Sequence, residues 1–386
     1  MNEKNTKQPI LGNGRFAPSP TGDFHIGNLR TALLAWACAR STGRGFRMRV
    51  EDLDERSRPE YCLRQLEDLA ALGIDWDGPE LYQSQRIDRY EEIFTSLLKS
   101  GRLYECYCTR KELASVASAP HRPPGSYPGT CRDLTESERE AGREKLRGTN
   151  REPALRLRTD ALSGELVDQQ LGYYCGAIDD LVIRRGDGVF SYNFVSVVDD
   201  AEYNVTQIVR GDDLLPSTPR QMHLQDLLGY PNPVYAHMPL ILNQAGARLA
   251  KRDGAVTLRQ LAELGWSSAD IVELLASSLY MGEAGCATAG DVSAAVSVSV
   301  SVSGSGGTSG AGAGTGGAGA GTGGAGTSGA GTGGAGTSGA DMARKRSGIR
   351  DTATFLNVFD PAALPREPWR VNVELLAAGP AVWFTD

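Results

Sequence analysis

Residues 18–28, PSPTGDFHIGN, form a loop rich in proline and glycine that leads into a helical pattern of apolar residues. Free backbone N–H groups at the start of a helix bind anions, and the helix dipole favours negative charge there. His25 adds a donor for a phosphate oxygen, and Gly27 lets a ligand approach the backbone closely. Alone, this pattern is more often an ordinary capped loop, so its meaning depends on a second element.

That second element is a basic loop far along the chain, RLAKRDG at residues 248–254. Alone it would be an ordinary solvated turn. Together with the first loop, Lys251 and Arg252 would bring two cations to a triphosphate held at the helix N-terminus. The pair therefore indicates a nucleotide site.

Cysteines between residues 106 and 131 indicate a metal site. Cys106 and Cys108 form a Cys-x-Cys pair, and Cys131 follows in the segment YPGTC. Zinc favours four ligands, including thiolates, so three cysteines leave one position open. By chemistry alone His121 would fill it, and three free cysteines without a metal remain the alternative.

Composition excludes several classes of protein. The 386 residues carry a net charge of −7, which argues against a general nucleic-acid coat but not against an enzyme with one basic face. Seven cysteines in this length do not make a disulfide scaffold. The N-terminus has no apolar leader, and no run approaches the ~20 apolar residues of a spanning helix. We expect a cytoplasmic protein without a membrane segment.

The nucleotide loops need strands and helices to position them. Strands are predicted at 14–19 and 46–53 with a helix between them, which is a parallel crossover unit. Helices at 59–72 and 85–100 follow. After a region of different character, the pattern predicts strands at 191–198, 206–210 and 234–242 and a helix at 217–228.

These patterns divide the chain into parts. Residues 284–350 pass from alternating Ser-Val into Gly, Ala, Thr and Ser, whose small side chains bury too little apolar area to offset chain entropy, so we predict a flexible linker. We predict a catalytic domain in two halves at 12–100 and 191–255, an inserted subdomain at 101–190, and a C-terminal part at 256–283 and 351–386.

The two loops together resemble the HIGH-like and KMSKS-like signatures of class I aminoacyl-tRNA synthetases. Further segments, RFAPSPTG from Arg15, RVEDLD from Arg49 and VRGDD from Val209, resemble the catalytic core of glutamyl-tRNA synthetases over residues 14–283. The resemblance implies an α/β fold: a Rossmann-like parallel sheet with an inserted zinc-binding subdomain and a small helical C-terminal part.

The resemblance also implies roles for single residues. Arginines suit the two carboxylates of glutamate because guanidinium binds carboxylates in a fork. Glu51 would bind the ammonium group, and Tyr192 would place a hydroxyl beside it. The implied glutamate-binding residues are Arg15, Phe16, Ala17, Pro18, Ser19, Glu51, Tyr192 and Arg210. The implied ATP-binding residues are His25, Gly27, Asn28 and Lys251, and the implied catalytic residues are His25, Lys251 and Arg252.

A Cys-x-Cys pattern followed by Tyr-x-x-x-Cys is similar to that of the glutamyl-Q tRNA(Asp) synthetase family, in which the tyrosine coordinates zinc. The resemblance thus implies one structural zinc on Cys106, Cys108, Tyr127 and Cys131, against the His121 alternative. The pieces after Arg252 are too short for the large helical anticodon-binding region of a full glutamyl-tRNA synthetase.

The family resemblance implies an activity and its partners. A ligase of this family activates L-glutamate with ATP and Mg²⁺, without needing tRNA, and transfers it to queuosine at the wobble position of tRNA(Asp). We expect a monomer. Two alternatives remain: a truncated glutamyl-tRNA synthetase that charges tRNA(Glu), and a non-catalytic paralogue that binds tRNA or amino acid. Ala250, where serine is common, mildly favours the paralogue.

Overall fold

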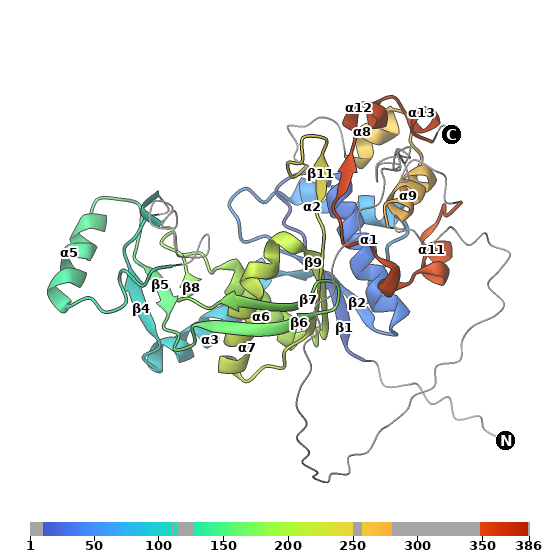
Figure 1. The fold of residues 1–386 in the computed structure, drawn as a ribbon. Helices are drawn as coiled ribbons and strands as arrows, with labels where there is room; N and C mark the ends of the chain where they lie inside the picture. Colours follow the sequence, from blue (N-terminus) through green and yellow to red (C-terminus); the bar gives the residue numbers. More distant parts are fainter. Residues whose placement is uncertain (1–10, 110, 114–126, 250–256, 280–347, 385–386) are drawn as a thin grey trace, which may run out of the picture.

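The computed structural model describes residues 11–109, 111–113, 127–249, 257–279 and 348–384 (Figure 1). His121, Lys251 and Arg252 lie outside the described residues. The predicted linker at 284–350 lies outside them as well, except for its last three residues.

Two parallel crossovers build the first part of the central sheet. β1 pairs in parallel with β2, and β2 pairs in parallel with β3. His25 caps the helix after β1, because its ring accepts the N–H of Gly27. Most side chains of this helix are buried. The elements are β1 (Asn13–Phe16), α1 (Ile26–Ser41), β2 (Gly45–Val50), α2 (Pro59–Ala71), β3 (Leu81–Tyr82), η1 (Gln83–Arg86) and α3 (Ile87–Lys99).

Two later strands complete this sheet. β9 pairs in parallel with β10, and a parallel bridge between Asn13 and Val205 places β9 beside β1. The strand order is therefore β3-β2-β1-β9-β10. Successive strands run outward from β1 on one side and from β9 on the other, so the strand order reverses between β1 and β9. Ligands of open α/β sheets bind at such a point, outside the carboxyl ends of the strands. The elements are α6 (Tyr192–Glu202), β9 (Gln207–Gly211), η2 (Asp212–Ser217), α7 (Thr218–Leu228) and β10 (Val234–Met238).

Two predicted strands differ from the structure. Residues 191–198 begin helix α6, because the Ser191 hydroxyl caps it by accepting the N–H of Phe194. A short apolar run that is buried on all sides has the same pattern in a strand and in a helix. The single strand predicted at 234–242 is two strands, β10 and β11 (Ile241–Asn243), separated around Pro239. Proline has no N–H to donate to a strand ladder.

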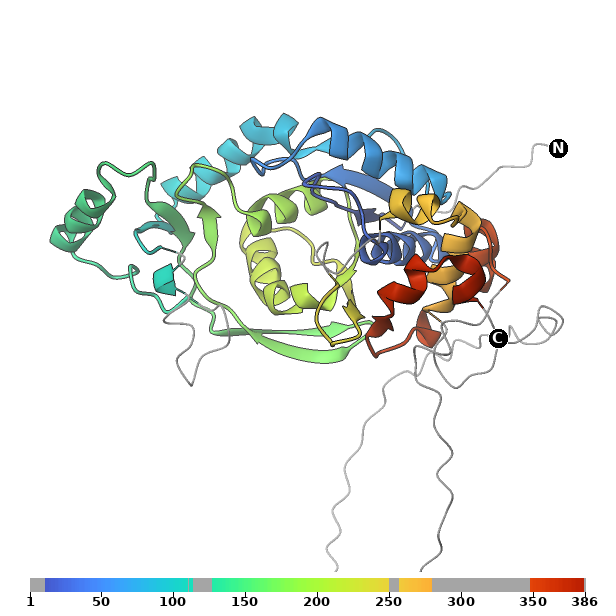
Figure 2. The same cartoon turned by 90° about the horizontal axis from the view of Figure 1, so that it is seen from above.

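The region after α3 forms a separate lobe and a long hairpin. β4, β5 and β8 make an antiparallel sheet, and helix α5 extends beyond it at the far end of the molecule (Figures 1 and 2). The hairpin of β6 and β7 runs from this lobe back along the catalytic part (Figure 2). The elements are β4 (Leu103–Cys106), α5 (Glu136–Leu146), β5 (Ala154–Leu157), β6 (Ser163–Asp168), β7 (Gly172–Ala177) and β8 (Val182–Arg184).

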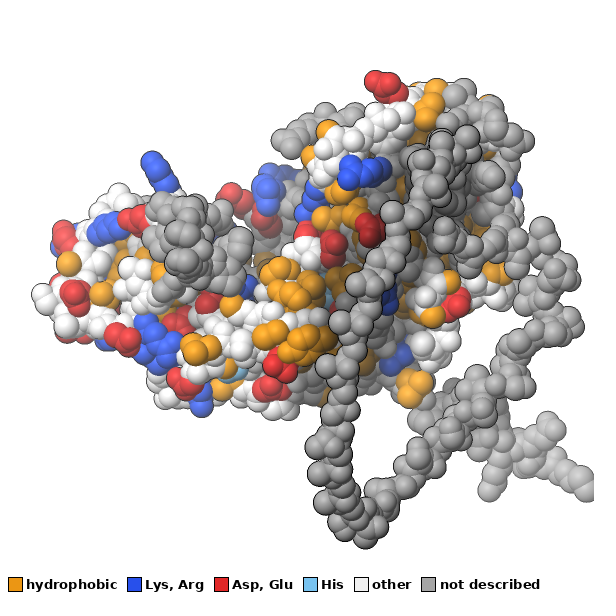
Figure 3. All heavy atoms as spheres, in the orientation of Figure 1, with side chains coloured by type: hydrophobic (Ala, Val, Ile, Leu, Met, Phe, Trp, Pro, Cys, Tyr) orange, Lys and Arg blue, Asp and Glu red, His pale blue; other side chains and the backbone are white. Residues whose placement is uncertain are grey.

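The β6–β7 hairpin has one buried and one exposed face. Leu166 and Asp168 are buried, whereas Val167 and Tyr173 are exposed. Hydrophobic side chains gather on the molecular surface over this hairpin (Figure 3). Its tip reaches the central sheet, because the N–H of Gln169 donates to the carbonyl of Tyr235 in β10 (2.8 Å).

The C-terminal part is largely helical, as the sequence predicts. Its two pieces, which come before and after the predicted linker in the sequence, pack together. Its residues pack into the same hydrophobic core as α1. The Arg350 guanidinium contacts Asp270 (2.9 Å) and Glu273 (3.4 Å), and β12 pairs in parallel with β11. The elements are α8 (Leu258–Glu263), α9 (Ser268–Ser277), α11 (Thr352–Val358), η4 (Pro361–Ala363), β12 (Trp369–Val371), α12 (Val373–Ala377) and α13 (Pro380–Trp383).

Candidate active site and metal centre

A cavity of about 250 Å³ opens at the carboxyl ends of β1 and β9, beside the start of α1. It brings together eight of the residues singled out from the sequence. They are Arg15, Phe16, Ala17, His25, Gly27, Asn28, Tyr192 and Arg210. Four arginines, Arg15, Arg30, Arg210 and Arg248, thus line a cavity together with a helix N-terminus, which suits a ligand that carries both carboxylate and phosphate.

His25 is fixed at the start of α1. Its Nδ1 accepts the N–H of Gly27 (3.0 Å), and its own N–H donates to the Asn28 side chain (3.2 Å). Since Nδ1 is an acceptor, the neutral ring carries its proton on Nε2. The Nε2–H group is therefore the donor of this ring, as the role predicted from the sequence requires.

Glu51 lies in an adjoining hollow of about 120 Å³, which Ser19 also lines. Tyr192 borders both this hollow and the main cavity. The carbonyl of Pro18 accepts the N–H of Glu51 (2.9 Å), which ties the loop after β1 to the end of β2. The predicted ammonium-binding and carboxylate-binding residues are thus neighbours, with Tyr192 between them.

A buried charge network lies behind Glu51. The Arg49 guanidinium donates to Glu51 (3.0 Å) and to Asp200 (2.5 Å), and Arg15 lies 3.4 Å from the same Asp200 carboxylate. Burial raises the pKa of Glu51 above its usual value despite the neighbouring Arg49. Burial would also raise the pKa of Asp200, but Arg49 and Arg15 outweigh it and hold that pKa below its usual value.

Sequence reasoning assigned no role to Arg49 or Asp200. Arg49 and Glu51 are two residues apart at the end of β2, so they share a face of the strand. The contact between Arg49 and Glu51 could therefore have been predicted from this spacing. The contact of Arg49 with Asp200 of helix α6 could not, because it depends on how α6 packs against the sheet.

The described start of the basic loop reaches the cavity. Arg248 lines it and pairs with Asp213 (2.6 Å). Lys251 and Arg252 follow Arg248 by three and four positions but are outside the described residues, so their predicted role stays a prediction.

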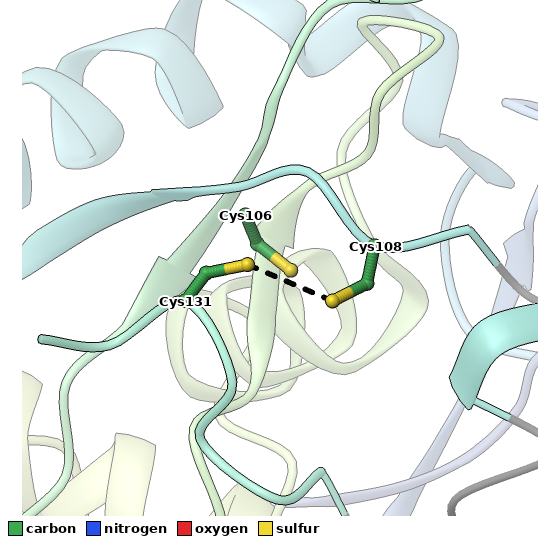
Figure 4. A group of neighbouring side chains, drawn as sticks. All are labelled: Cys106, Cys108 and Cys131. Atoms are coloured by element: carbon green, nitrogen blue, oxygen red, sulfur yellow. Dashed lines mark hydrogen bonds between the residues drawn. The ribbon is translucent and has the colours of Figure 1, made fainter. Parts of the chain in front are cut away.

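Three cysteines of the inserted lobe lie close together (Figure 4). The sulfur atoms of Cys106, Cys108 and Cys131 are all within 4.8 Å of one another, and those of Cys108 and Cys131 are 3.6 Å apart. Four ligands at a Zn–S distance of about 2.3 Å in a tetrahedron would be about 3.8 Å apart. The donor set therefore has the spacing that zinc requires.

Tyr127 completes this cluster. Its hydroxyl lies 3.5 Å from the Cys106 sulfur and accepts the N–H of Cys131 (2.8 Å). The Arg156 guanidinium lies 3.6 Å from the centre of the Tyr127 ring. His121, the alternative fourth ligand, lies outside the described residues.

The electrostatics of the cluster favour a cation. Hydrogen bonding from the Cys131 thiol, with help from Arg156, holds the pKa of Cys106 below its usual value, which favours the thiolate that a metal ion binds. Burial raises the pKa of the Tyr127 hydroxyl. A divalent cation lowers the pKa of groups that bind it, which would offset this effect.

The chain matches known proteins over most of its length. The family model of the class I tRNA synthetase (E and Q) catalytic domain matches residues 13–301. A glutamyl-Q tRNA(Asp) synthetase from Nocardia farcinica is 58% identical over 270 residues, which cover 70% of this chain and 85% of the relative. A glutamate–tRNA ligase from Alkalilimnicola ehrlichii is 43% identical over 278 residues, which cover 66% of this chain and 57% of the ligase.

A solved structure shares the fold. The glutamate tRNA ligase of Elizabethkingia meningosepticum, in complex with its amino acid, superposes with a TM-score of 0.64 at 22% identity and covers 95% of this chain and 68% of that chain. No helix among the described residues has the length and apolar character needed to cross a membrane. The chain belongs to the class I tRNA synthetase family for glutamate and glutamine, among its glutamyl-Q tRNA(Asp) synthetases.

Proposed function

We propose that this protein activates L-glutamate with ATP and transfers it to the queuosine at the wobble position of tRNA(Asp). The observation that carries the proposal is the cavity that Arg15 and Arg210 line together with the N-terminus of α1. The guanidinium groups suit the carboxylates of glutamate, and the helix start suits the phosphates of ATP.

The adenylate forms when a carboxylate oxygen of glutamate attacks the α-phosphorus of ATP. The new O–P bond replaces the bond to the β-phosphate, and pyrophosphate leaves. His25 donates to a phosphate oxygen from its Nε2, while Gly27 and Asn28 hold the phosphates at the helix start. Lys251 and Arg252 stabilise the developing charge, and Mg²⁺ bound with ATP supplies further charge stabilisation.

The glutamate orientation follows from the two sides of the cavity. Arg15 and Arg210 bind the carboxylates, Glu51 binds the ammonium group, and the Tyr192 hydroxyl lies between them. Phe16, Ala17, Pro18 and Ser19 form the wall along β1 and the loop after it. In the second step a hydroxyl of queuosine attacks the activated carbonyl, and AMP leaves.

We also propose one structural zinc ion in the inserted subdomain, held by Cys106, Cys108, Cys131 and Tyr127. The sulfur spacing and the position of the Tyr127 hydroxyl support it. Zinc there would brace the lobe around β4 and β5, which is the part we expect to contact tRNA.

We propose the domain boundaries predicted from the sequence, with 101–190 as the tRNA-contacting insertion. We propose a monomer in the cytoplasm.

The proposed acceptor rests on the pattern of relatives. Identity reaches 58% with a glutamyl-Q tRNA(Asp) synthetase that the match covers to 85%, against 43% with a glutamate–tRNA ligase covered to 57%. This difference favours queuosine-bearing tRNA(Asp) over tRNA(Glu) as the acceptor.

Transfer of radiolabelled glutamate tests the proposal directly. We expect labelling of queuosine-containing tRNA(Asp), and none of unmodified tRNA(Asp) or of tRNA(Glu). Glutamate-dependent exchange of pyrophosphate into ATP should proceed without any tRNA. Labelling of tRNA(Glu) with tRNA-dependent exchange would establish the truncated glutamyl-tRNA synthetase instead. Failure of exchange under all conditions would favour the non-catalytic paralogue.

A further inference from the structure

A fully buried histidine lies directly behind the glutamate-binding arginine. His237 in β10 is 0% exposed. Its Nε2 is 3.0 Å from Nε of Arg210, and its Nδ1 is 2.6 Å from a carboxylate oxygen of Asp168. Asp168 lies at the end of β6, at the tip of the hairpin that returns from the inserted lobe.

The donor chemistry of this chain decides the state of the imidazole. The Nε atom of arginine carries one hydrogen and has no lone pair to offer, so it can only donate. Nε2 of His237 must therefore accept, which leaves the ring neutral with its proton on Nδ1. That proton donates to Asp168, so the pair is a neutral imidazole held by a carboxylate.

Asp168 is itself held in place. Its carboxylate accepts the backbone N–H groups of His237 (3.1 Å), Gln170 (3.0 Å) and Leu171 (3.0 Å). The Gln170 side chain in turn donates to the carbonyl of Leu364 (3.0 Å), in the C-terminal part. The hairpin tip is thus anchored on one side to the sheet and on the other to the end of the chain.

We propose that Asp168 and His237 are positioning residues for glutamate, acting through Arg210. Asp168 holds His237 as the Nδ1–H tautomer, and Nε2 of His237 then holds Nε of Arg210. Thr218 fixes the same guanidinium by accepting from its Nη2 (2.8 Å). Among the described residues, Nη1 of Arg210 has no protein acceptor, so its protons remain for a carboxylate of the ligand. The inference rests on the proposed role of Arg210 in binding glutamate.

Protonation of His237 would break this arrangement. A second proton on the ring removes the acceptor for Arg210 and places a cation beside two others. Burial, which outweighs the hydrogen bond to Asp168, lowers the pKa of His237 from 6.5, so the ring is neutral at pH 7. The charged groups that act on it come from β6, β9, β1 and η2: Asp168, Arg210, Arg15 and Asp212.

Variants can separate positioning from packing. In Asp168→Asn the amide can donate to Nδ1 of His237, which would shift the ring proton to Nε2. The Nε2–H group would then face the Nε–H group of Arg210, and neither could accept. We expect the KM for glutamate in ATP–pyrophosphate exchange to rise about tenfold to a hundredfold, the effect of losing one hydrogen bond to a charged group. The KM for ATP should stay unchanged.

His237→Gln keeps an acceptor oxygen where Nε2 lies, and its amide does not take up a proton in the pH range of the assay. Its KM for glutamate should stay within about threefold of the wild type at pH 7.5, whereas His237→Leu should match Asp168→Asn. The KM of the wild type should rise below pH 6.5, relative to that of His237→Gln. His223→Gln is the matched control, because His223 bonds Thr159 and lies outside the cavity.

Nitrogen-15 NMR of the histidine rings gives a readout that does not depend on activity. We expect one ring with a protonated Nδ1 and a bare Nε2 at pH 7.5, absent from His237→Gln. A proton on Nε2, or equal glutamate KM values in His237→Leu and the wild type, would overturn the proposal. Loss of all exchange in the wild type would instead refute the proposed function, and the ring spectrum would still decide the positioning arrangement.

Discussion

Arg49→Met removes a buried cation from between the carboxylates of Glu51 and Asp200. Arg49 is 2% exposed, and it donates to both partners. Methionine fills a similar volume but leaves two buried carboxylates without their shared donor. Breaking a buried pair by removing one partner costs about 3–5 kcal/mol.

The surface pair of Arg56 and Asp54 supplies the matched control. Their guanidinium and carboxylate are 2.8 Å apart, but the Arg56 side chain is 73% exposed. Exposed pairs contribute roughly 0.2–1 kcal/mol. In denaturant unfolding, Arg56→Met should therefore leave the free energy of unfolding almost unchanged. Arg49→Met should lower it several-fold more than Arg56→Met does.

The pH dependence distinguishes lost charge from lost packing. In the wild type the pKa of Asp200 is held low, so its contribution to stability is present above the unfolded pKa and is lost as pH falls. In Arg49→Met, burial would raise the pKa values of Glu51 and Asp200. Both carboxyl groups would then take up protons as the pH falls, and the variant would no longer bury two unpaired charges. The stability difference between wild type and Arg49→Met should shrink between pH 8 and pH 5. Equal losses at both pH values, or a loss no larger than that of Arg56→Met, would refute the reasoning.

Three further predictions concern the ligands, the metal and the linker. Glu51→Gln should raise the KM for glutamate by about thirtyfold or more, the loss of a buried charged partner, with the KM for ATP little changed. Lys251→Ala should do the reverse, and equal effects of both variants on both substrates would show the roles to be misassigned. Tyr127→Phe and Cys131→Ser should lose or weaken one equivalent of zinc in elemental analysis and impair transfer more than exchange; full zinc retention in Tyr127→Phe would exclude Tyr127 as a ligand. Deletion of residues 290–345 should leave the melting temperature almost unchanged, because loop closure entropy varies slowly with length, and a fall of several degrees would contradict this.

Much of the catalytic fold could be predicted from the sequence, because the patterns that indicate it involve residues close together in the chain. The alternating strand Phe46–Val50 and the capped helix after His25 follow from neighbouring residues alone. The same holds for the predicted anion site, since the loop and the helix N-terminus that would form it are adjacent in sequence. The cysteine spacing likewise predicted a metal cluster, and the three sulfur atoms do lie together.

Contacts between distant segments decided the rest. The tip of the β6–β7 hairpin places Asp168 against His237, which lies 69 positions later in the chain, and no local pattern indicates that contact. Residues 192–198 form a helix because Ser191 caps it and because Phe194–Val198 are buried in the core. The sequence by itself determined the family, and it indicated the nucleotide loops and the candidate metal-binding cysteines, because these depend on residue identity and short spacing. Only the tertiary structure decided which buried charges face one another, because burial and partner geometry arise from packing between segments that are far apart in the chain.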